Sequence, residues 1–234
     1  MQDQLAFDLP VTPARGVDDF LVTPSNQAAM AIVNGWALWP NQKLVLAGAR
    51  GTGKTHLAHV WADQSGAEII HADRLDTTVI EALAGGSVVV EDVDRIAGDR
   101  ASETALFHLH NLVLAEGGWL MLTAEDAPSR WGLRLPDLRS RMEGTTLARL
   151  EPPDDMLLSA VLVKLFHDRQ ISVNANLVDY LVPRMERSLA AAGHLVQALD
   201  QVALSEQRPI TRALAQRVLG IAASGDFGGD FGGD

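Results

Sequence analysis

The spacing of hydrophobic residues divides the chain into two regions that predict different secondary structure. Up to residue 151, short unbroken apolar runs alternate with segments in which apolar residues return every three or four positions. An unbroken run predicts a strand buried on both faces, and the longer spacing predicts an amphipathic helix. We expect strands at 43–47, 68–71, 87–90, 119–122 and 147–150, and helices at 25–39, at 75–83, at 102–116 and, after segment 48–55, up to Gly66. This alternation predicts an α/β fold with a parallel sheet sandwiched by helices.

From residue 152 onward the pattern is helical, and a small all-α domain is expected after the prolines Pro152 and Pro153, which predict a hinge. The helices are expected at 154–169, 174–187, 189–206 and 211–221. The end of the chain repeats Asp-Phe-Gly-Gly, and this glycine content predicts disorder. The predicted organisation is an extended arm at 1–16, an α/β domain at 17–151, a helical domain at 152–221 and a glycine-rich tail at 222–234.

The composition narrows the classes of partner. The chain has 19 Lys and Arg against 30 Asp and Glu, a net charge of −11. Such a surface repels phosphate backbones, and without a dense basic patch we expect no direct sequence-specific DNA binding. Without cysteine there is no disulfide framework and no thiolate metal site. No apolar run approaches the length of a membrane span and the N-terminus lacks a basic signal-peptide region, so we expect a cytoplasmic protein with no membrane partner.

The segment between the first predicted strand and the next helix is a full G-x-x-x-x-G-K-[ST] motif. Its glycines let backbone N–H groups turn toward a phosphate, and the helix N-terminus adds partial positive charge. Lys54 would reach the terminal phosphates and Thr55 would place its hydroxyl on Mg²⁺. The alternative is a glycine turn that binds nothing. The residues expected to hold ADP or ATP are Gly48, Ala49, Arg50, Gly51, Thr52, Gly53, Lys54, Thr55 and His56.

Polar residues stand at the ends of two later buried strands. Glu91 and Asp92 end the run 88–90, and such carboxylates would bind Mg²⁺, directly or through water, or position an attacking water. Glutamate in the first place departs from the usual Asp-first order, which puts the geometry for hydrolysis in doubt. Thr123 ends the next strand, where it would reach the γ-phosphate or the attacking water. A capping or turn role for Thr123 is an equal alternative.

Three further features leave alternatives open. The large apolar residues Leu5, Phe7 and Leu9 recur at every second position, which suits either an edge strand or an extended peptide that inserts into a partner. Segment 135–141 carries two arginines near the domain junction, and its last residue, Arg141, would make surface ion pairs or reach a neighbour's nucleotide. The histidines form no defensible metal site, so we interpret them as core or surface residues.

The phosphate loop, the carboxylate-tipped strand, Thr123 and an arginine before a helical bundle together resemble the AAA+ ATPases, and most closely the DnaA family of replication initiators. The resemblance spans residues 17 to about 220. Segment 20–28 resembles the family's entry segment around the adenine, which implies nucleotide contacts by Phe20, Val22 and Asn26. Segment 135–141 resembles the one that bears the arginine finger, which implies this role for Arg141. Residues 199–202 lie in a helix that resembles the family's lid.

The N-terminal Gln4-Leu5-Ala6-Phe7-Asp8-Leu9 is similar to the short peptides that dock on the bacterial β sliding clamp. This favours the peptide interpretation and implies clamp contacts by Gln4, Leu5, Phe7 and Leu9. The resemblance implies a regulator of replication initiation that binds an adenine nucleotide and the clamp and stimulates ATP hydrolysis on DnaA in trans, which prevents re-initiation. It also allows a homo-oligomer. The family's C-terminal helix-turn-helix DNA-binding domain is not expected in this sequence.

The lid departs from the family in one position. The slot for the arginine that senses the phosphates falls at Gly193, beside His194, and Arg184 and Arg187 are out of register. Together with Glu91, this implies a chain that holds nucleotide but turns it over poorly. The alternative is a DnaA-like initiator or helicase loader that contacts DNA or helicase directly. A small-molecule kinase would also use a phosphate loop, but no substrate pocket is evident from the sequence.

Overall fold

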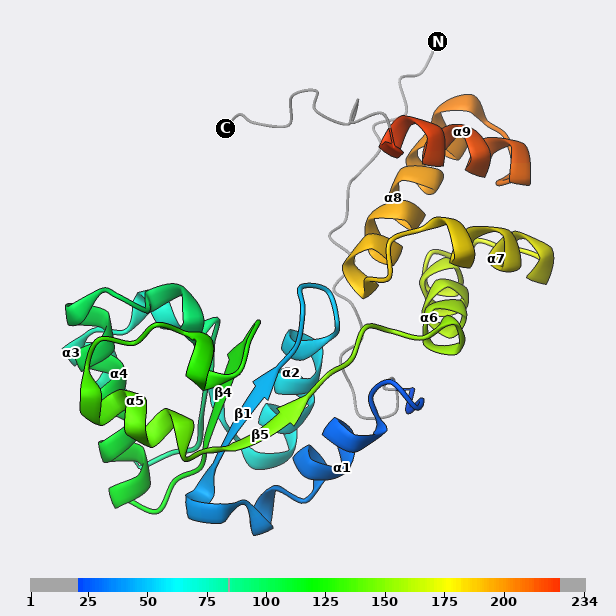
Figure 1. Cartoon of the computed structure of the whole chain (residues 1–234). Coiled ribbons are helices and arrows are strands. Elements are labelled where there is room, and N and C mark those ends of the chain that lie inside the picture. The colour runs from blue at the N-terminus through cyan, green and yellow to red at the C-terminus, as the bar shows by residue number, and fades with distance from the viewer. Residues whose placement is uncertain (1–20, 84, 224–234) are drawn as a thin grey trace.

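The structure is a computed structural model that describes residues 21–83 and 85–223. A five-stranded parallel sheet, with strand order β2-β3-β4-β1-β5, forms its centre (Figure 1). This confirms the predicted α/β fold. Parallel strands buried on both faces need unbroken apolar runs, and the three central strands have them. The strands are β1 Lys43–Ala47, β2 Glu68–His71, β3 Val88–Glu91, β4 Leu120–Ala124 and β5 Thr146–Arg149.

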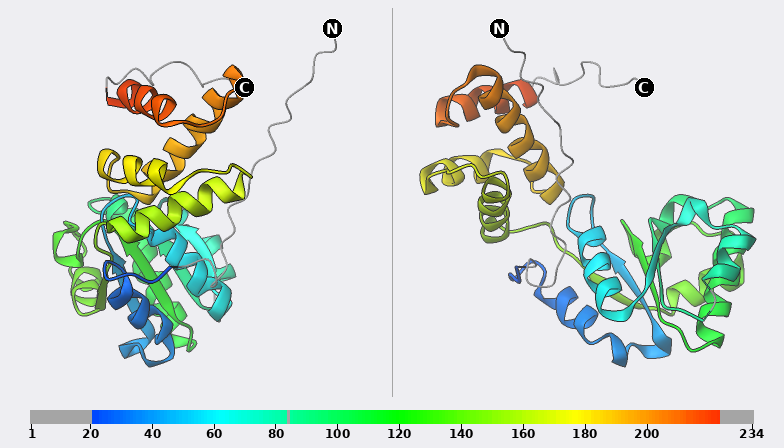
Figure 2. Two further views of the ribbon diagram at one scale, coloured as in Figure 1. Left: turned by 90° about the vertical axis from the view of Figure 1, so that its right-hand side faces the viewer. Right: turned by 180° about the vertical axis from the view of Figure 1, so that it is seen from behind.

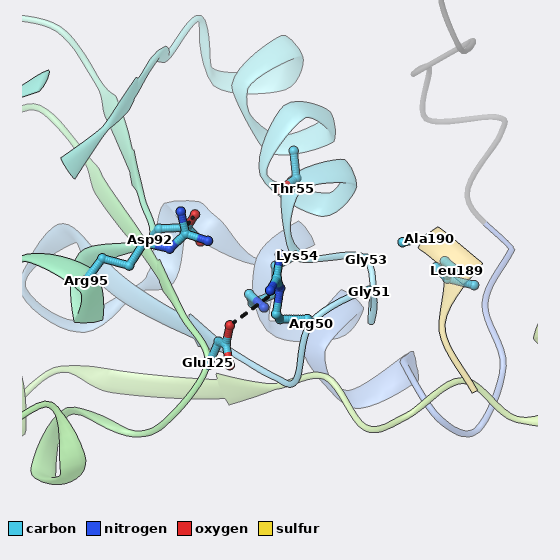
Figure 3. Close-up of a pocket in the computed structure, with 10 residues that line it drawn as sticks. All are labelled: Arg50, Gly51, Gly53, Lys54, Thr55, Asp92, Arg95, Glu125, Leu189 and Ala190. Atoms are coloured by element: carbon cyan, nitrogen blue, oxygen red, sulfur yellow. Dashed lines mark ion pairs between the residues drawn. The ribbon is translucent and has the colours of Figure 1, made fainter. Parts of the chain in front are cut away.

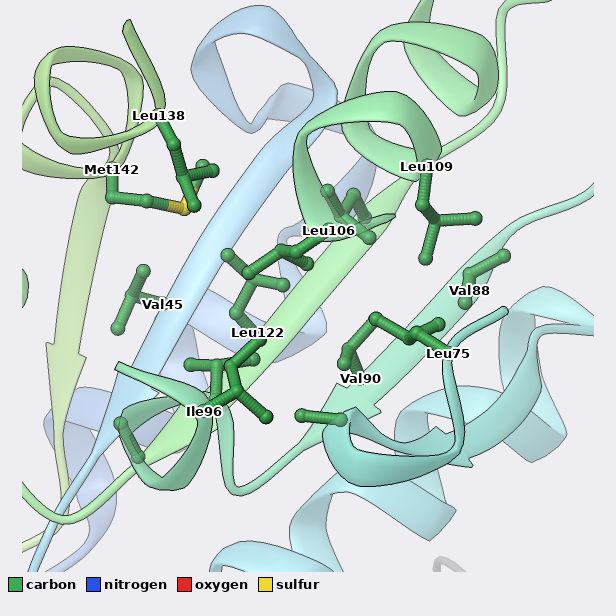
Figure 4. Close-up of a cluster of buried hydrophobic side chains, with 14 of the residues drawn as sticks. Val45, Leu75, Val88, Val90, Ile96, Leu106, Leu109, Leu122, Leu138 and Met142 are labelled. Atoms are coloured by element: carbon green, nitrogen blue, oxygen red, sulfur yellow. The ribbon is translucent and has the colours of Figure 1, made fainter. Parts of the chain in front are cut away.

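Helices cover both faces of the sheet because successive side chains of a strand point to opposite sides. Leu44 and Val89 pack with the helices on one face, and Val45 and Val90 pack in the cluster on the other (Figure 4). The first face holds α1 Gln27–Asn34 and α2 Lys54–Ser65, and the second holds α3 Thr77–Ala82, α4 Arg100–Ala115 and α5 Pro136–Glu143.

One predicted helix is shorter than expected. The helix predicted at 25–39 ends at Asn34, and two 3₁₀ turns, Trp36–Leu38 and Pro40–Gln42, follow it. Gly35 caps the helix, and the indole N–H of Trp39 donates to the carbonyl of Ile32, 2.8 Å away, which folds the chain back. The apolar spacing alone did not reveal this contact between residues seven positions apart.

The helices after residue 152 build a separate hydrophobic cluster. The helix predicted at 174–187 is also shorter than expected. The α-helix α7 ends at Leu181, and the 3₁₀ turn Val182–Arg184, which contains Pro183, follows it. The side chains of Asp154, Asn174 and Ser188 cap three of these helices by accepting a hydrogen bond from the backbone N–H three residues on. The helices are α6 Asp155–Asp168, α7 Ala175–Leu181, α8 Leu189–Glu206 and α9 Arg212–Ala223.

This helical domain lies beside the sheet domain, and the loop between β1 and α2 points toward the start of α8 (Figures 1 and 2). Among the described residues, no helix combines the length and apolar character that crossing a membrane requires. The predicted clamp peptide, Gln4, Leu5, Phe7 and Leu9, lies outside the described residues, as do Phe20 and most of the predicted tail.

Candidate nucleotide-binding site

The loop between β1 and α2 adopts a conformation that depends on glycine. Gly51 and Gly53 have φ of +74° and +103°, values that other residues rarely adopt. A Cβ on Gly48 would lie 2.7 Å from the carbonyl oxygen of Leu150, closer than packing permits. Gly53 directly precedes α2, so the loop ends at the N-terminus of a twelve-residue helix, where unpaired backbone N–H groups favour an anion.

Lys54 lies inside this loop and is only 8% exposed. Its Nζ donates hydrogen bonds to the carbonyl oxygens of Gly48 and Ala49, at 2.7 and 3.1 Å. Burial lowers the pKa of Lys54, and the nearby carboxylates of Glu125 and Asp92 oppose this effect. The ammonium group is therefore held at the loop that the motif assigns to phosphate.

A cavity of about 330 Å³ opens beside Lys54 (Figure 3). Two ion pairs lie along its wall: Arg50 Nε to Glu125 Oε1 at 3.9 Å, and Arg95 Nε to Asp92 Oδ2 at 3.4 Å. The cavity joins the phosphate loop, the ends of β3 and β4 and the first turn of α8. It is lined by Arg50, Gly51, Gly53, Lys54, Thr55, Asp92, Arg95, Glu125, Leu189 and Ala190.

A hydrogen bond from a backbone N–H to a side-chain hydroxyl joins the ends of β3 and β4. Asp92 has a φ of +57°, in the left-handed region, and its N–H donates to the hydroxyl oxygen of Thr123 at 3.1 Å. A non-glycine residue in this region stores strain of about 1–3 kcal/mol, which is commonest at functional sites. Thr123 is buried and accepts from the backbone at the strand end. This hydrogen bond gives Thr123 a positioning contact with Asp92.

The acidic residues at the end of β3 match the oxygen donors that Mg²⁺ prefers. Glu91 is buried, its Oε2 lies 3.6 Å from His71 Nε2, and its Oε1 has no hydrogen-bond partner among the described residues. A buried oxygen without a partner is suited to an ion or its bound water. Thr55 and Asp92 face the cavity. Within the described part of the chain, no group of three or more His, Cys, Asp or Glu is placed to hold a metal ion.

The lid domain contacts the phosphate loop directly. The backbone N–H of Leu189 donates to the carbonyl of Gly51 at 2.7 Å, and a Cβ on Gly51 would collide with Ser188 Oγ. Gly193, at the position where the resemblance expects the family's sensor arginine, carries no side chain. Arg184 stacks on the ring of Tyr180, and Arg187 pairs with Asp155 at 2.6 Å. These two arginines are engaged within the lid and at its hinge.

Other predicted nucleotide residues lie outside the lining of this cavity. Val22 is half exposed, and Asn26 is buried, where its side chain bonds the backbones of Leu21 and Thr23 and fixes the segment before α1. His56 is partly buried in the first turn of α2, and Glu91 and Thr123 lie behind Asp92. The lining residues that we did not single out from the sequence are Arg95, Glu125, Leu189 and Ala190.

Two of these omissions had a signal in the sequence. Glu125 follows directly after strand β4, and Arg95 lies four residues beyond the last residue of β3. Polar residues at the carboxyl ends of parallel strands converge on the ligand edge of an open α/β sheet. Leu189 and Ala190 carry no comparable signal, because they reach the cavity only through the docking of α8.

Arg141 lies near the start of β1, at the opposite end of the strands from the cavity. It is exposed in the last turn of α5, and its carbonyl oxygen accepts a hydrogen bond from Lys43 Nζ at 3.0 Å. Lys43 starts β1, whereas the phosphate loop follows the other end of that strand, about 13 Å away at the usual rise. The guanidinium lies over the ring of Phe107, 5.1 Å from its centroid. The fold therefore directs Arg141 away from the cavity of its own chain.

Comparisons with known proteins agree with this geometry. Residues 155–219 match the family model described as Hda, lid domain. The chromosomal replication initiator protein DnaA of Thermomicrobium roseum is 29% identical over 241 residues, which cover 89% of this chain and 50% of that protein. The chain thus spans about half the length of this relative.

Solved structures of DnaA share the fold. Domain III of the Thermotoga maritima replication initiation protein DnaA superposes with a TM-score of 0.76 at 18% identity, covering 90% of this chain and 98% of that one. AMPPCP-bound DnaA from Aquifex aeolicus gives a TM-score of 0.66 at 18% identity, covering 80% and 65%. At such identities the likeness concerns the fold.

Proposed function

Because the chain is a DnaA-related AAA+ protein that carries an Hda-type lid, we propose that it binds ADP or ATP and stimulates ATP hydrolysis on DnaA in trans through Arg141. The observation that carries this proposal is the position of Arg141, exposed and on the far edge of the sheet from the cavity of its own chain. An arginine there meets a phosphoryl group only when that group belongs to another molecule. The chain is thereby a regulator of replication initiation.

The nucleotide proposal rests on the loop and its surroundings. Loop amides and Lys54 supply the positive groups for the phosphates, and one structural neighbour, DnaA from Aquifex aeolicus, binds AMPPCP, an adenine nucleotide analogue. Mg²⁺, held by Thr55 with Asp92 or Glu91, would neutralise charge on the phosphates. Residues Leu189 and Ala190 of α8 close the cavity from the lid side, so a bound nucleotide is enclosed by both domains.

Turnover by the chain itself is expected to be weak. Gly193 adds no lid cation, and Arg141 lies at the other edge of the sheet. Glu91 replaces the shorter aspartate at the end of β3, which shifts the carboxylate relative to a bound water. Nucleotide then serves to fix the lid against the loop, through contacts such as Leu189 with Gly51, rather than to drive a cycle.

The action of Arg141 follows from its chemistry. A guanidinium stays charged at every physiological pH and presents donors in a fixed plane that matches phosphate oxygens. The face of Phe107 favours this cation and restricts the conformations of its long side chain. Placed against the nucleotide of DnaA, the guanidinium stabilises the charge that develops as the phosphoryl group leaves.

The variant Arg141→Ala tests this action. It is expected to lower the stimulated rate of ATP hydrolysis on DnaA by about 10³ to 10⁵, the usual effect of removing such a finger. Affinity for ADP and ATP is expected to stay unchanged, because Arg141 lies away from the cavity. The matched control is Arg139→Ala, an equally exposed arginine in α5. Undiminished stimulation by Arg141→Ala would remove the proposal.

We also propose that Gln4, Leu5, Phe7 and Leu9 bind the β sliding clamp and so hold the chain near replicating DNA. The support is the similarity of this sequence to clamp-docking peptides. The test is a pull-down on purified clamp with the double variant Gln4→Ala and Leu5→Ala, with binding of ADP as the control for folding. Clamp binding that survives both changes would contradict this part.

A further inference from the structure

A second buried lysine lies at the end of β1 remote from the nucleotide. Lys43 is only 7% exposed, and its Nζ lies 3.2 Å from His110 Nε2 and 3.0 Å from the carbonyl oxygen of Arg141. His110 belongs to α4 and Arg141 to α5, so one ammonium group joins the sheet to two helices. The hydroxyl of Thr145 donates to the same Arg141 carbonyl at 2.8 Å.

The electrostatics of this cluster do not favour a role for Lys43 that is limited to stabilising the fold. Lys43 has no carboxylate ion-pair partner within the described residues, and burial, followed by the charge of Arg141, lowers its pKa. Burial and then the charge of Lys43 lower the pKa of His110 to about 4, so the ring is neutral at pH 7 and its Nε2 can accept from Lys43. Burying a lysine without a counter-ion costs stability, and an apolar residue of similar volume commonly serves as well or better.

The last turn of α5 is where Lys43 finds its compensation. Carbonyl groups at the end of a helix lack backbone partners and carry partial negative charge, which favours a cation. The carbonyl of Arg141 receives two side-chain donors, from Lys43 and Thr145, and this fixes the point from which the long Arg141 side chain extends. The ring of Phe107 then limits its direction.

We propose that Lys43, held by His110, is a positioning residue that sets the backbone of Arg141 for its action on the nucleotide of a partner ATPase. The proposal rests on the proposed function. Lys43 touches no reacting atom and acts through Arg141. Since an error of about 1 Å in the placement of a catalytic group costs about a hundredfold in rate, a fixed carbonyl at the base of an exposed arginine has a direct kinetic value.

The variant Lys43→Met keeps most of the side-chain volume and removes the donor. With the full chain, the maximal rate of stimulated hydrolysis on DnaA is expected to fall tenfold to about a hundredfold. The concentration of chain that gives half-maximal stimulation, the affinity for ADP and the thermal midpoint are expected to change little. Lys164→Met, the same change on the lid, is the matched control and leaves all four quantities unaltered.

Several outcomes overturn the inference. An unchanged maximal rate in Lys43→Met does so, as does a loss explained entirely by a higher half-maximal concentration. If Lys43→Met does not fold, Thr145→Val removes the second donor to the Arg141 carbonyl and is expected to lower the maximal rate in the same manner; an unchanged rate there also overturns it. Full stimulation by Arg141→Ala defeats the proposed function itself, whereas loss in Arg141→Ala with full activity in Lys43→Met defeats only the positioning role.

Discussion

The chain buries Lys43, the first residue of β1, and Lys54, which follows the other end of that strand at the start of α2, and the two differ in what surrounds them. Lys43 and Lys54 are almost equally buried, and both donate hydrogen bonds to backbone carbonyls. Carboxylates of Glu125 and Asp92 raise the pKa of Lys54 against the effect of burial, whereas the charge of Arg141 lowers that of Lys43 further. Lys54 lies in a cavity that admits a ligand, and Lys43 in a packed junction between helices.

On the proposed function, this difference separates nucleotide binding from action on the partner within one sheet. The cavity edge is built from glycines and strand ends, which expose backbone N–H groups. The Arg141 edge is built from side-chain packing against α4 and α5, which leaves the guanidinium of Arg141 exposed. Changes at one edge should therefore affect nucleotide affinity and changes at the other should affect the partner's rate.

The largest effect is expected from Lys54→Met. This variant loses charge-assisted hydrogen bonds to phosphate, so its affinity for ADP and ATP should fall by about a hundredfold, or about 3 kcal/mol. Calorimetry with both nucleotides in the presence of Mg²⁺ measures it. Lys43→Met, tested beside it, should bind nucleotide as the unmodified chain does. Equal losses in the two variants would contradict the separation.

A smaller effect is expected from acidification at the Arg141 edge. The pKa of His110 is lowered from 6.5 to about 4 in the fold, so below pH 6.5 the unfolded chain takes up a proton that the folded chain excludes. Stability from this residue is complete above pH 6.5 and is lost as the pH falls toward 4. Between pH 7 and 5 the loss is about 2 kcal/mol.

Urea unfolding at pH 7 and pH 5 measures this contribution. The variant His110→Gln should lose about 2 kcal/mol less than the unmodified chain over that interval. His108→Gln, an exposed histidine of the same helix, is the control and should retain the full dependence. A steep pH dependence that persists in His110→Gln would show that other groups cause it.

The smallest effect compares two glycines with similar backbones. Gly51 and Gly66 have φ of +74° and +69°, so alanine at either should cost about 1–2 kcal/mol of folding free energy. A Cβ at Gly66 meets nothing within 4 Å, whereas at Gly51 it collides with Ser188 of the lid. Gly51→Ala should therefore also weaken nucleotide binding, measured by calorimetry, and Gly66→Ala should not. Equal nucleotide affinities of the two variants would show that the contact between Gly51 and the lid does not contribute to nucleotide binding.

Much of the nucleotide edge was predictable because its chemistry is local. The motif 48–55 fixes a turn, a helix start and a lysine within eight residues, and unbroken apolar runs fix the buried strands around it. The α/β fold and the helical lid were predicted for the same reason. The fine role of Thr123 was left open between two alternatives, and its hydrogen bond to the backbone of Asp92 is a contact between two strands.

Contacts between distant segments decided the rest. The docking of α8 brought Leu189 to the cavity. The first helix is the exception, because Gly35 and the bond from the Trp39 indole to Ile32, seven residues away, shorten it locally. The sequence did not predict a role for Lys43, because a lysine at the start of a strand is ordinarily exposed to water.

The sequence by itself therefore determined the order of strands and helices and the residues of the phosphate loop, since these depend on apolar spacing and on neighbours along the chain. Only the tertiary structure decided that Arg141 faces away from the cavity of its own chain and that Lys43 holds its carbonyl. The physical reason is that residues 43, 110 and 141 meet only after the sheet and both helices have packed, and no local pattern records which carbonyl a buried ammonium group will reach.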